Sequence, residues 1–294
     1  MNDKSEAPIA WIGLGLIGLP MASRLVQAGR KVRGFDIDAK RMELARARGI
    51  SLAADAPAAI SGAGIVFTSL PSEDALVGAA AAIAGAMRRD AILVETSTVG
   101  PDASAAVAKA LQGMAYLRAP ISGSTALAET GQLSTFVSGP RAAFEAALPA
   151  FRAYTRAQSW LGEGEEARYA KLAVNLMVAV TAGMMGEALA FARKGGIGWQ
   201  AMLDVIADSV VASPLVKYKL DPLRKRDFTP AATNSLVLKD LHVLVESAAR
   251  AGVPLPLANH MLGAYRGLVE AGGKDEDFFS AVKVAERAAG LGDP

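Results

Sequence analysis

The chain has 294 residues, of which 52% are hydrophobic and 20% charged, so it can fill two cores of ordinary size and no long disordered segment is expected. Its formal net charge is only +2 and it has no basic stripe, which does not favour nucleic acid as a partner. It contains no cysteine, which excludes disulfides, thiolate metal sites and a cysteine nucleophile.

The first predicted elements enclose a glycine-rich turn. The apolar run 8–13 predicts a strand that ends in Gly13, Gly15 and Gly18, and a helical pattern follows over 16–29. Gly13 would allow the tight turn, Gly15 would let a pyrophosphate approach the backbone, and Gly18 would let the helix pack close to the strand. Between a strand and a helix, this pattern predicts a dinucleotide-binding fingerprint with phosphates at the helix N-terminus. A glycine-rich turn in another kind of α/β domain is the alternative.

An acidic residue follows at the spacing that such a fingerprint requires. A second strand, predicted at 31–36, ends on Asp36, 18 residues after the last glycine. A carboxylate there can hold both hydroxyls of an NAD ribose and would repel the 2′-phosphate of NADP. We therefore expect NAD to be preferred, with NADP possible, and Leu16 and Ile17 of the turn to contact the cofactor as well.

Strands and helices continue to alternate up to about residue 164. Further strands are predicted at 64–70, 91–96, 115–119, 133–138 and 156–161. Helices are predicted between them at 38–48, 72–87, 101–112 and 140–153. This alternation predicts a doubly wound, mostly parallel sheet of the Rossmann type.

Two loops that follow predicted strands are candidates for cofactor binding. Leu70 and Pro71 end the strand at 64–70, and Ser97 and Thr98 follow the strand at 91–96. Because ligands of open α/β sheets bind beyond the carboxyl ends of the strands, we expect these residues to flank the nicotinamide and its ribose.

A serine-rich turn is a candidate anion site. Ser122, Gly123 and Ser124 come between the strand at 115–119 and a predicted short helix. The hydroxyl of Ser122 and the backbone amides of Gly123 and Ser124 could hold a substrate carboxylate. A plain strand–helix turn is the alternative.

Beyond residue 164 the sequence predicts helices only. A long helix is predicted over 165–194, and further helices near 199–209, 233–252, 255–271 and 276–290. We therefore expect a dinucleotide-binding Rossmann domain at 1–164 and an all-helical substrate and oligomerisation domain at 165–294 that begins with a long interdomain helix. The basic cluster at 217–226 is interpreted as a solvated charged face.

No segment predicts membrane insertion or secretion. The apolar stretch 172–186 is short for a membrane span and suits a buried helix. The polar residues 1–8 lack the apolar region of a signal peptide. We expect a cytoplasmic protein with no membrane partner.

Two polar residues of the long helix are the main candidates for chemistry. Lys171 and Asn175 are one turn apart on the same face of an otherwise apolar helix. Beside a dinucleotide domain, the lysine could exchange a proton with a substrate oxygen during hydride transfer, and Asn175 could hold that oxygen or orient the lysine. A boundary lysine beside a satisfied buried asparagine is the alternative. His242 and His260 are too far apart for a helical metal pair, so no metal is expected.

Taken in order, these segments resemble the β-hydroxyacid dehydrogenase family, which includes 3-hydroxyisobutyrate dehydrogenase and tartronate semialdehyde reductase. The glycine fingerprint, APISG at 119–123, Lys171 with Asn175, and LKDL at 238–241 match that family's motifs over nearly the whole chain. The resemblance implies that Lys171 is the general acid/base and that the turn containing Ser122 binds the substrate carboxylate. It also implies a homodimer or homotetramer.

The LKDL segment shows what the resemblance adds. From the residues alone, Lys239 and Asp240 suggest a solvated helix face. The resemblance implies instead that Lys239 lies near the nicotinamide and the substrate.

The chain departs from the family pattern at two positions. Arg118 stands where the family commonly has an acid, and Ser124 stands where the 3-hydroxyisobutyrate branch has glycine. Ser-Gly-Ser followed by AETGQL looks more like the glyoxylate/succinic semialdehyde reductase branch, which usually uses NADPH. That signal conflicts with Asp36, and we base the expected cofactor on the charge of Asp36. Which branch of the family gives the substrate stays open.

The expected function is that of an NAD(P)-dependent oxidoreductase that interconverts a small β-hydroxyacid and its semialdehyde by hydride transfer. The expected partner is therefore a small carboxylate-bearing substrate. One alternative is imine reduction on the same scaffold, although such enzymes generally lack the lysine. The other is a non-catalytic dinucleotide-binding protein, which would not need the pair formed by Lys171 and Asn175.

Overall fold

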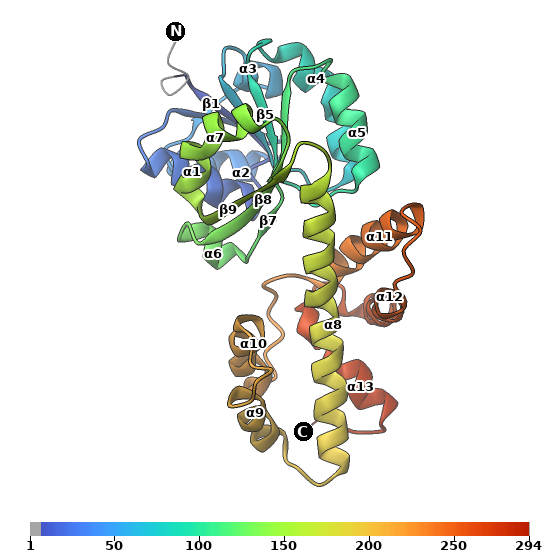
Figure 1. Ribbon diagram of the computed structural model, residues 1–294. Helices are drawn as coiled ribbons and strands as arrows, with labels where there is room; N and C mark the ends of the chain where they lie inside the picture. Colours follow the sequence, from blue (N-terminus) through green and yellow to red (C-terminus); the bar gives the residue numbers. More distant parts are fainter. Residues whose placement is uncertain (1–6, 294) are drawn as a thin grey trace. The chain divides into compact units, whose positions relative to one another are not determined.

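The computed structural model describes residues 7–293 (Figure 1). The chain divides into two compact units, Met1–Lys171 and Leu172–Pro294.

The first unit is built on a nine-stranded sheet. Its strands are β1 (Ile9–Ile12), β2 (Val32–Phe35), β3 (Ser51–Leu52), β4 (Ile65–Thr68), β5 (Ile92–Glu95), β6 (Ala115–Arg118), β7 (Ile121–Ser122), β8 (Leu133–Ser138) and β9 (Thr155–Gly162). The order is β3-β2-β1-β4-β5-β6-β8-β7, with β9 paired to β8. Strands β1 to β6 pair in parallel, whereas β8 runs antiparallel to β6 and β7. This is the doubly wound order, so the predicted Rossmann-type fold is confirmed, and its switch point lies between β1 and β4.

Helices cover both faces of this sheet (Figure 1). They are α1 (Gly18–Gln27), α2 (Ala39–Ala47), α3 (Ala56–Ile60), α4 (Glu73–Ala86), α5 (Pro101–Ala110), α6 (Thr125–Glu129) and α7 (Arg141–Tyr154). Alternate residues of each strand face opposite layers, so Trp11 of β1 packs in the core beneath α1 and α7, whereas its neighbour Ala10 packs in the core beneath α3 to α5.

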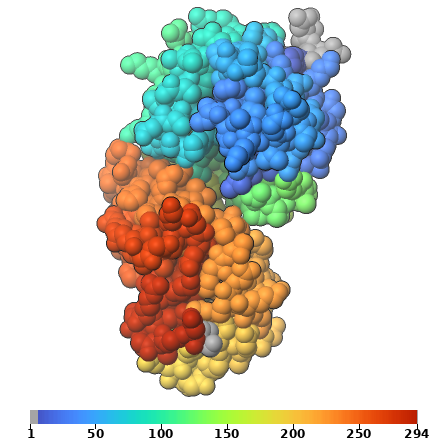
Figure 2. Space-filling model, turned by 180° about the vertical axis from the view of Figure 1, so that it is seen from behind, coloured from blue at the N-terminus to red at the C-terminus, as the bar shows by residue number. Residues whose placement is uncertain are grey.

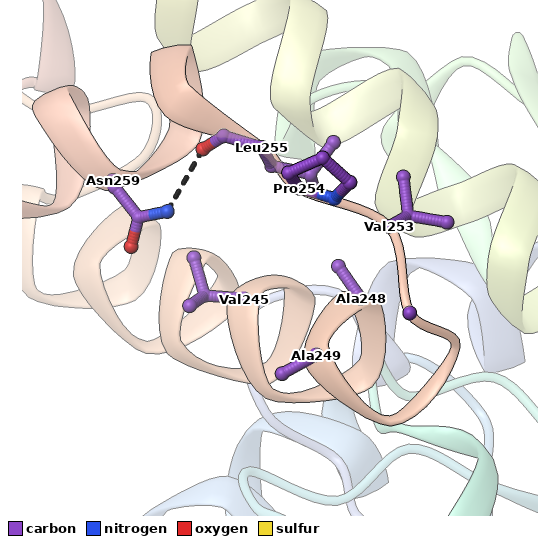
Figure 3. A pocket seen from close by; sticks show the side chains of 8 residues that line it. Val245, Ala248, Ala249, Val253, Pro254, Leu255 and Asn259 are labelled. Carbon is purple, nitrogen blue, oxygen red and sulfur yellow. Dashed lines mark hydrogen bonds between the residues drawn. The ribbon is translucent and has the colours of Figure 1, made fainter.

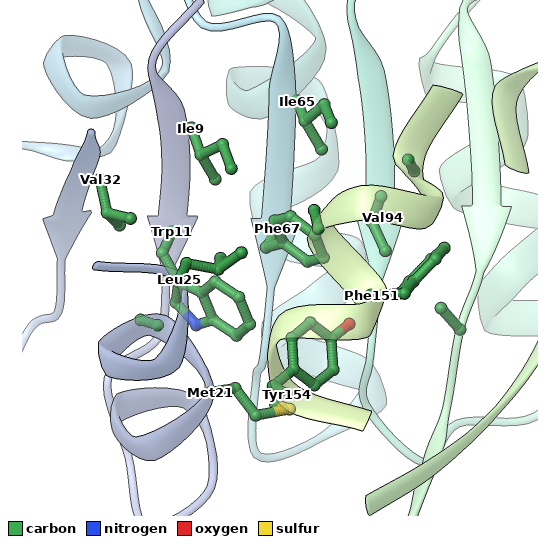
Figure 4. Packing of buried hydrophobic residues seen from close by; sticks show 14 of the residues in the cluster. Ile9, Trp11, Met21, Leu25, Val32, Ile65, Phe67, Val94, Phe151 and Tyr154 are labelled. Atoms are coloured by element: carbon green, nitrogen blue, oxygen red, sulfur yellow. The ribbon is translucent and has the colours of Figure 1, made fainter. Parts of the chain in front are cut away.

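An aromatic cluster anchors the glycine turn (Figure 4). The rings of Trp11 and Phe67 stack with their centroids 4.7 Å apart, and Tyr154 of α7 meets both edge-on at 6.1 Å. Such ring pairs each contribute about 0.5–1.5 kcal/mol beyond their buried area. The indole N–H of Trp11 also donates to the carbonyl of Gly13 at 3.0 Å. The core therefore fixes the start of the glycine turn.

The second unit is helical. Helix α8 (Glu166–Lys194) begins in the first unit and continues into the second. It is followed by α9 (Trp199–Ala207), α10 (Pro214–Lys225), α11 (Asn234–Arg250), α12 (Pro256–Leu268), a π-helical turn η1 (Val269–Gly273), a 3₁₀ turn η2 (Phe278–Ala281) and α13 (Val282–Ala288). Among the residues described after α8, the only β pairing is an isolated bridge between Thr233 and Asp277.

The division into compact units falls at Lys171 rather than at the expected residue 164. The first turn of α8 is bonded to the sheet unit, which explains the difference. The backbone N–H of Ala167 donates to the hydroxyl of Ser138 at 3.2 Å, and Arg168 is buried among sheet residues.

The interpretation of the basic cluster at 217–226 as a solvated face is wrong for two residues. Lys219 of α10 is 3% exposed and lies 2.7 Å from the carboxylate of Asp277, over the rings of neighbouring aromatic residues. Arg226 pairs with the buried Glu286 of α13 at 2.9 Å. The first pair joins α10 to the residue before the 3₁₀ turn η2, and the second joins the C-terminal end of α10 to α13. The orange and red segments lie side by side on the face shown in Figure 2.

Among the described residues, α8 alone is long and apolar enough to cross a membrane by length and composition. The mean hydropathy of its most apolar stretch is 1.6, and 33% of that stretch is buried. Core helices of soluble proteins meet the same criterion.

Candidate active site

The glycine turn after β1 has the backbone that its three glycines predict. Gly13 has φ +91°, and a Cβ atom there would lie 2.2 Å from the carbonyl oxygen of Ser69. At Gly18 a Cβ atom would lie 2.1 Å from the carbonyl oxygen of Gly13. At Gly15 it would meet nothing within 4 Å. Gly13 and Gly18 are thus required by packing, whereas Gly15 leaves open space over the turn, which suits a pyrophosphate.

Asp36 is directed at this turn. Its Oδ2 accepts a hydrogen bond from the backbone N–H of Leu14 at 2.6 Å, and its Oδ1 accepts one from the N–H of Asp38 at 2.9 Å. Each carboxylate oxygen keeps a further lone pair for a ribose hydroxyl. Ile17, the N-cap residue of α1, makes no capping side-chain bond, and Leu16 is 66% exposed. The residues present therefore fit a dinucleotide at the switch point of the sheet.

The two loops predicted to flank the nicotinamide are joined by Ser97. Its hydroxyl accepts a hydrogen bond of 2.8 Å from the N–H of Leu70, and its own N–H donates to Glu95 at 2.6 Å. The loops after β4 and β5, which also carry Pro71 and Thr98, thus meet at one residue. The Ser97 hydroxyl keeps one hydrogen to donate.

Reasoning from the sequence missed a buried ion pair beneath these loops. Arg168 of α8 and Glu95 of β5 are 1% and 0% exposed, and the guanidinium donates to the carboxylate. It also donates to the carbonyl of Ser97 at 2.9 Å and to the hydroxyl of Tyr116 at 3.0 Å. Burial alone would lower the pKa of Arg168, but Glu95 and Tyr116 outweigh burial and raise it, so the arginine stays charged.

Arg118, where the family commonly has an acid, is also paired inside the first unit. Its Nε donates to Glu165 at 2.9 Å and to Ser104 at 3.2 Å. Its guanidinium lies over the ring of Tyr116, 4.3 Å from the centroid. Glu165 and Ser104 thus hold the side chain, which is only 11% exposed, away from solvent.

The serine turn connects β7 to α6. Gly123 has φ +138°, and a Cβ atom there would lie 2.7 Å from the side chain of Leu133, so the turn requires glycine. The hydroxyl of Ser124 caps α6 by accepting from the N–H of Leu127 at 3.4 Å. Ser122 lies at the end of β7. The turn has the donors that a carboxylate needs, and its role stays a prediction.

Lys171 lies on the helix face that the first unit anchors. Arg168 precedes it by three residues, and residues three apart lie on the same side of an α-helix. That side is the one that contacts the carboxyl end of β5 through Glu95 and Ser97. Lys171 itself is half-buried.

In the second unit, three residues from α8 and α11 meet. The side-chain N–H of Asn175 donates to Oδ2 of Asp240 at 2.8 Å, and the ammonium of Lys239 lies 3.1 Å from Oδ1 of the same carboxylate. The solvated-face interpretation is wrong for Asp240, whose side chain is 13% exposed. Asp240 is thus a candidate site residue. It belongs to the LKDL segment at 238–241, but the site predicted from the sequence did not include it.

Comparison with known families decides the assignment. Residues 8–162 match the model of the NAD-binding domain of 6-phosphogluconate dehydrogenase. Residues 165–285 match the model described as NAD-binding of NADP-dependent 3-hydroxyisobutyrate dehydrogenase. The chain belongs to the β-hydroxyacid dehydrogenase family.

Three relatives show the extent of the likeness. The 2-(hydroxymethyl)glutarate dehydrogenase of Eubacterium barkeri is 27% identical, with 96% of each chain covered. The NAD-dependent L-serine dehydrogenase of Pseudomonas aeruginosa is 29% identical, with 96% of this chain and 99% of the relative covered. The structure of Mycobacterium tuberculosis 3-hydroxyisobutyrate dehydrogenase with L-serine superposes with a TM-score of 0.87 at 28% identity, covering 95% of this chain and 98% of that one. The expected class, an NAD(P)-dependent β-hydroxyacid dehydrogenase, is confirmed.

Two hollows in this family member lie away from the predicted site residues. One, of about 400 Å³, lies between α11 and α12, with Asn259 at its edge bonded to the carbonyl of Leu255 (Figure 3). The other, of about 420 Å³, is lined partly by Arg30, Lys31 and Arg33 at the amino end of β2. Neither includes a residue that the sequence assigns to cofactor or substrate.

Proposed function

We propose that this dehydrogenase prefers NAD and oxidises the hydroxyl-bearing carbon of a small 3-hydroxy acid to the semialdehyde, with Lys171 as the general acid/base. A dinucleotide held by the glycine turn and Asp36 would supply the hydride acceptor for that carbon. The observation that carries the proposal is the position of Lys171 on the face of α8 that Arg168 fixes against the carboxyl end of β5.

Asp36 supports the preference for NAD. Its carboxylate is held at the glycine turn by Leu14 and Asp38, so its negative charge has a fixed place where the cofactor ribose would bind. A 2′-phosphate at that place would meet a like charge, which disfavours NADP.

In this proposal Lys171 transfers the proton, and Asn175 and Asp240 orient the reacting oxygen. In the oxidative direction the neutral amine of Lys171 takes the hydroxyl proton as the carbon loses hydride, and in the reductive direction the ammonium returns it. The ammonium also stabilises negative charge that develops on the oxygen. Asn175, one helical turn later, orients that oxygen, and Asp240 fixes the Asn175 amide by accepting its N–H.

The substrate carboxylate is proposed to bind at the turn formed by Ser122, Gly123 and Ser124. The turn offers two hydroxyls and backbone amides, and the packing of Gly123 against Leu133 and Leu127 fixes the backbone that carries them. Arg118 is not proposed as a carboxylate ligand because Glu165 already neutralises it.

A substrate panel tests the proposed function. Purified protein is assayed with NAD and NADP against 3-hydroxyisobutyrate, L-serine, 2-(hydroxymethyl)glutarate and threonate. It is assayed with NADH and NADPH against tartronate semialdehyde, glyoxylate and succinic semialdehyde, with cyclic imines as a separate class. Turnover of at least one 3-hydroxy acid, faster with NAD, is expected. Turnover of imines alone, or dinucleotide binding without any turnover, would refute the assignment.

We also propose that the protein forms a homo-oligomer through α8. Met177, Met184 and Phe191 recur every seven residues and are 70%, 50% and 82% exposed, which forms an apolar stripe along the helix. Light scattering coupled to gel filtration should give a dimer or tetramer, and Phe191→Asp should shift the protein towards monomer. A wild-type monomer at micromolar concentration would refute this proposal.

A further inference from the structure

We propose that Glu95 and Arg168 are a positioning pair that sets the place of Lys171 relative to the loops that flank the nicotinamide. This inference rests on the proposed function, because it assigns a role to residues that touch neither substrate nor cofactor.

The pair lies between the two parts of the proposed site that have to be aligned: the loop beside the nicotinamide and the helix turn that leads to Lys171. Glu95 is the last residue of β5, directly before the loop that carries Ser97 and Thr98. Arg168 lies in the first turn of α8, three residues before Lys171. At 1.5 Å of rise per residue, this places Lys171 about 4.5 Å further along the helix axis, on the same side.

Ser97 joins the pair to the loops. Its carbonyl accepts from Arg168, its N–H donates to Glu95, and its hydroxyl accepts from the N–H of Leu70. The pair thus makes two of the three bonds that hold this junction, one from each member. Replacing Arg168 removes one of them and replacing Glu95 weakens the other, which would loosen the loops after both β4 and β5.

The start of α8 has two further anchors in the same unit, one in its first turn and one at the residue before it. The N–H of Ala167 donates to Ser138, and Glu165 pairs with Arg118. These contacts keep the helix attached when Arg168 is changed. The variant should thus stay folded while Lys171 and the loops lose their alignment.

An ion pair suits alignment better than apolar packing would. A well-packed apolar pair of the same volume is often as stable as a buried ion pair, so stability alone does not call for charge here. The planar guanidinium, however, reaches three acceptors in fixed directions: Glu95, Ser97 and Tyr116. It therefore fixes the orientation of the turn as well as its distance from the sheet.

A matched ion pair in the second unit provides the control. Lys219 and Asp277 are 3% and 4% exposed, and Asp277 also accepts backbone N–H groups, as Glu95 does. Asp277 carries no proposed role in binding or catalysis. Glu95→Gln and Arg168→Met are compared with Asp277→Asn in the full-length protein.

The measurements separate alignment from stability. For each variant we would measure the melting temperature, NADH affinity by calorimetry, kcat, KM, and the primary isotope effect with deuterated substrate. All three variants should lower the melting temperature by several degrees, since each breaks a buried pair. Only Glu95→Gln and Arg168→Met should lower kcat, by roughly 10- to 100-fold, with a smaller change in KM and a larger isotope effect, because misplacement by about 1 Å has effects of that size.

Equal losses of stability in all three variants, with unchanged kcat and isotope effect in the first two, would overturn the inference.

If the wild type turns over no member of the panel, the proposed function fails, and the role of the pair is then tested by NADH affinity alone. A loss of NADH affinity of about 10-fold in Glu95→Gln but not in Asp277→Asn then supports the alignment role for the loops, and unchanged affinity contradicts it. If Glu95→Gln does not fold, Arg168→Lys, which keeps the charge but cannot reach all three acceptors, replaces it with the same expected outcome.

Discussion

The side-chain amide of Asn175 donates a hydrogen bond of 2.8 Å to the carboxylate of Asp240. Because the amide nitrogen is committed to this bond, the amide oxygen faces away from Asp240 and remains an acceptor. Asn175 follows Lys171 by one helical turn, so that oxygen can accept from a substrate hydroxyl or from the lysine ammonium.

Replacement of Asp240 should therefore act through Asn175. In Asp240→Ala the amide loses its partner and can rotate, and we expect kcat to fall by about 10-fold, within the range of misplaced polar groups at reacting centres. Steady-state kinetics under saturating cofactor measure the effect. Asp204→Ala, which removes an exposed ion pair with Arg224 in the same unit, is the control and should leave kcat unchanged. Equal kcat values for the two variants would remove Asp240 from the site.

Substitutions at two glycines of the turn should have different effects, one on stability and the other on NADH binding. Gly18→Ala puts a Cβ atom against the carbonyl of Gly13 and should destabilise the protein by about 1–3 kcal/mol. Gly15→Ala meets no protein atom, so it should keep the melting temperature but weaken NADH binding by about 10-fold or more. Gly78→Ala in α4 also meets no atom and is the control for NADH affinity, which it should leave unchanged. Its melting temperature should not fall, because alanine favours the helix. Normal NADH affinity in Gly15→Ala would place the pyrophosphate elsewhere.

Asp36 should set the choice of cofactor through its charge. Asp36→Asn keeps an acceptor for the N–H of Leu14 but removes the negative charge. We expect the ratio of kcat/KM for NAD to that for NADP to fall by about 10-fold or more, which corresponds to about 1.4 kcal/mol of lost discrimination. Kinetics with both cofactors give this ratio. A wild-type protein that prefers NADP would contradict the argument.

Two buried tyrosines should respond to the loss of a hydroxyl in opposite ways. The hydroxyl of Tyr154 is buried and has no hydrogen-bond partner among residues 7–293, whereas that of Tyr265 donates to the carbonyl of Phe278 at 3.0 Å. Tyr154→Phe should raise the free energy of unfolding by up to about 1 kcal/mol, and Tyr265→Phe should lower it by about 1–3 kcal/mol. Urea denaturation measures both. A loss of stability in Tyr154→Phe would show that its hydroxyl is satisfied.

The same tyrosines predict how stability changes at high pH. Burial raises the pKa of Tyr154 and of Tyr265, and for Tyr265 the carboxylate of Asp277 raises it further. A raised folded-state pKa contributes stability that is complete below the unfolded-state value of about 10 and is lost as pH rises above it. Unfolding by alkali should therefore release tyrosinate absorbance from these residues together with the loss of circular dichroism. Their ionisation before unfolding would contradict the burial argument.

The start of the first unit could be predicted from sequence because its determinants are local. Strand β1, the glycine turn, α1 and Asp36 are adjacent in the chain, and Gly13 and Gly18 are each required by a close backbone contact. In contrast, β3 and β7 have only two residues each and take their structure from neighbouring strands, so no periodicity could reveal them. Helix α10 was missed because its charged residues suggested a solvated segment.

The parts of the site that sequence did not reveal depend on partners far along the chain. Arg168 and Glu95 are 73 residues apart, and Lys219 and Asp277 are 58 apart. In the sequence, Arg168 lies in the charge-rich segment GEGEEARYAK, where no pattern distinguishes a buried arginine from an exposed one. Only the fold brings its acceptors together.

The turnover of Lys171→Ala tests the central claim most directly. The variant should bind NADH as the wild type does, while kcat for the preferred 3-hydroxy acid falls by about 100-fold or more, the scale of a positioned acid/base group. Near-normal kcat in the folded variant would contradict the account, because the proton would then move without the amine at position 171.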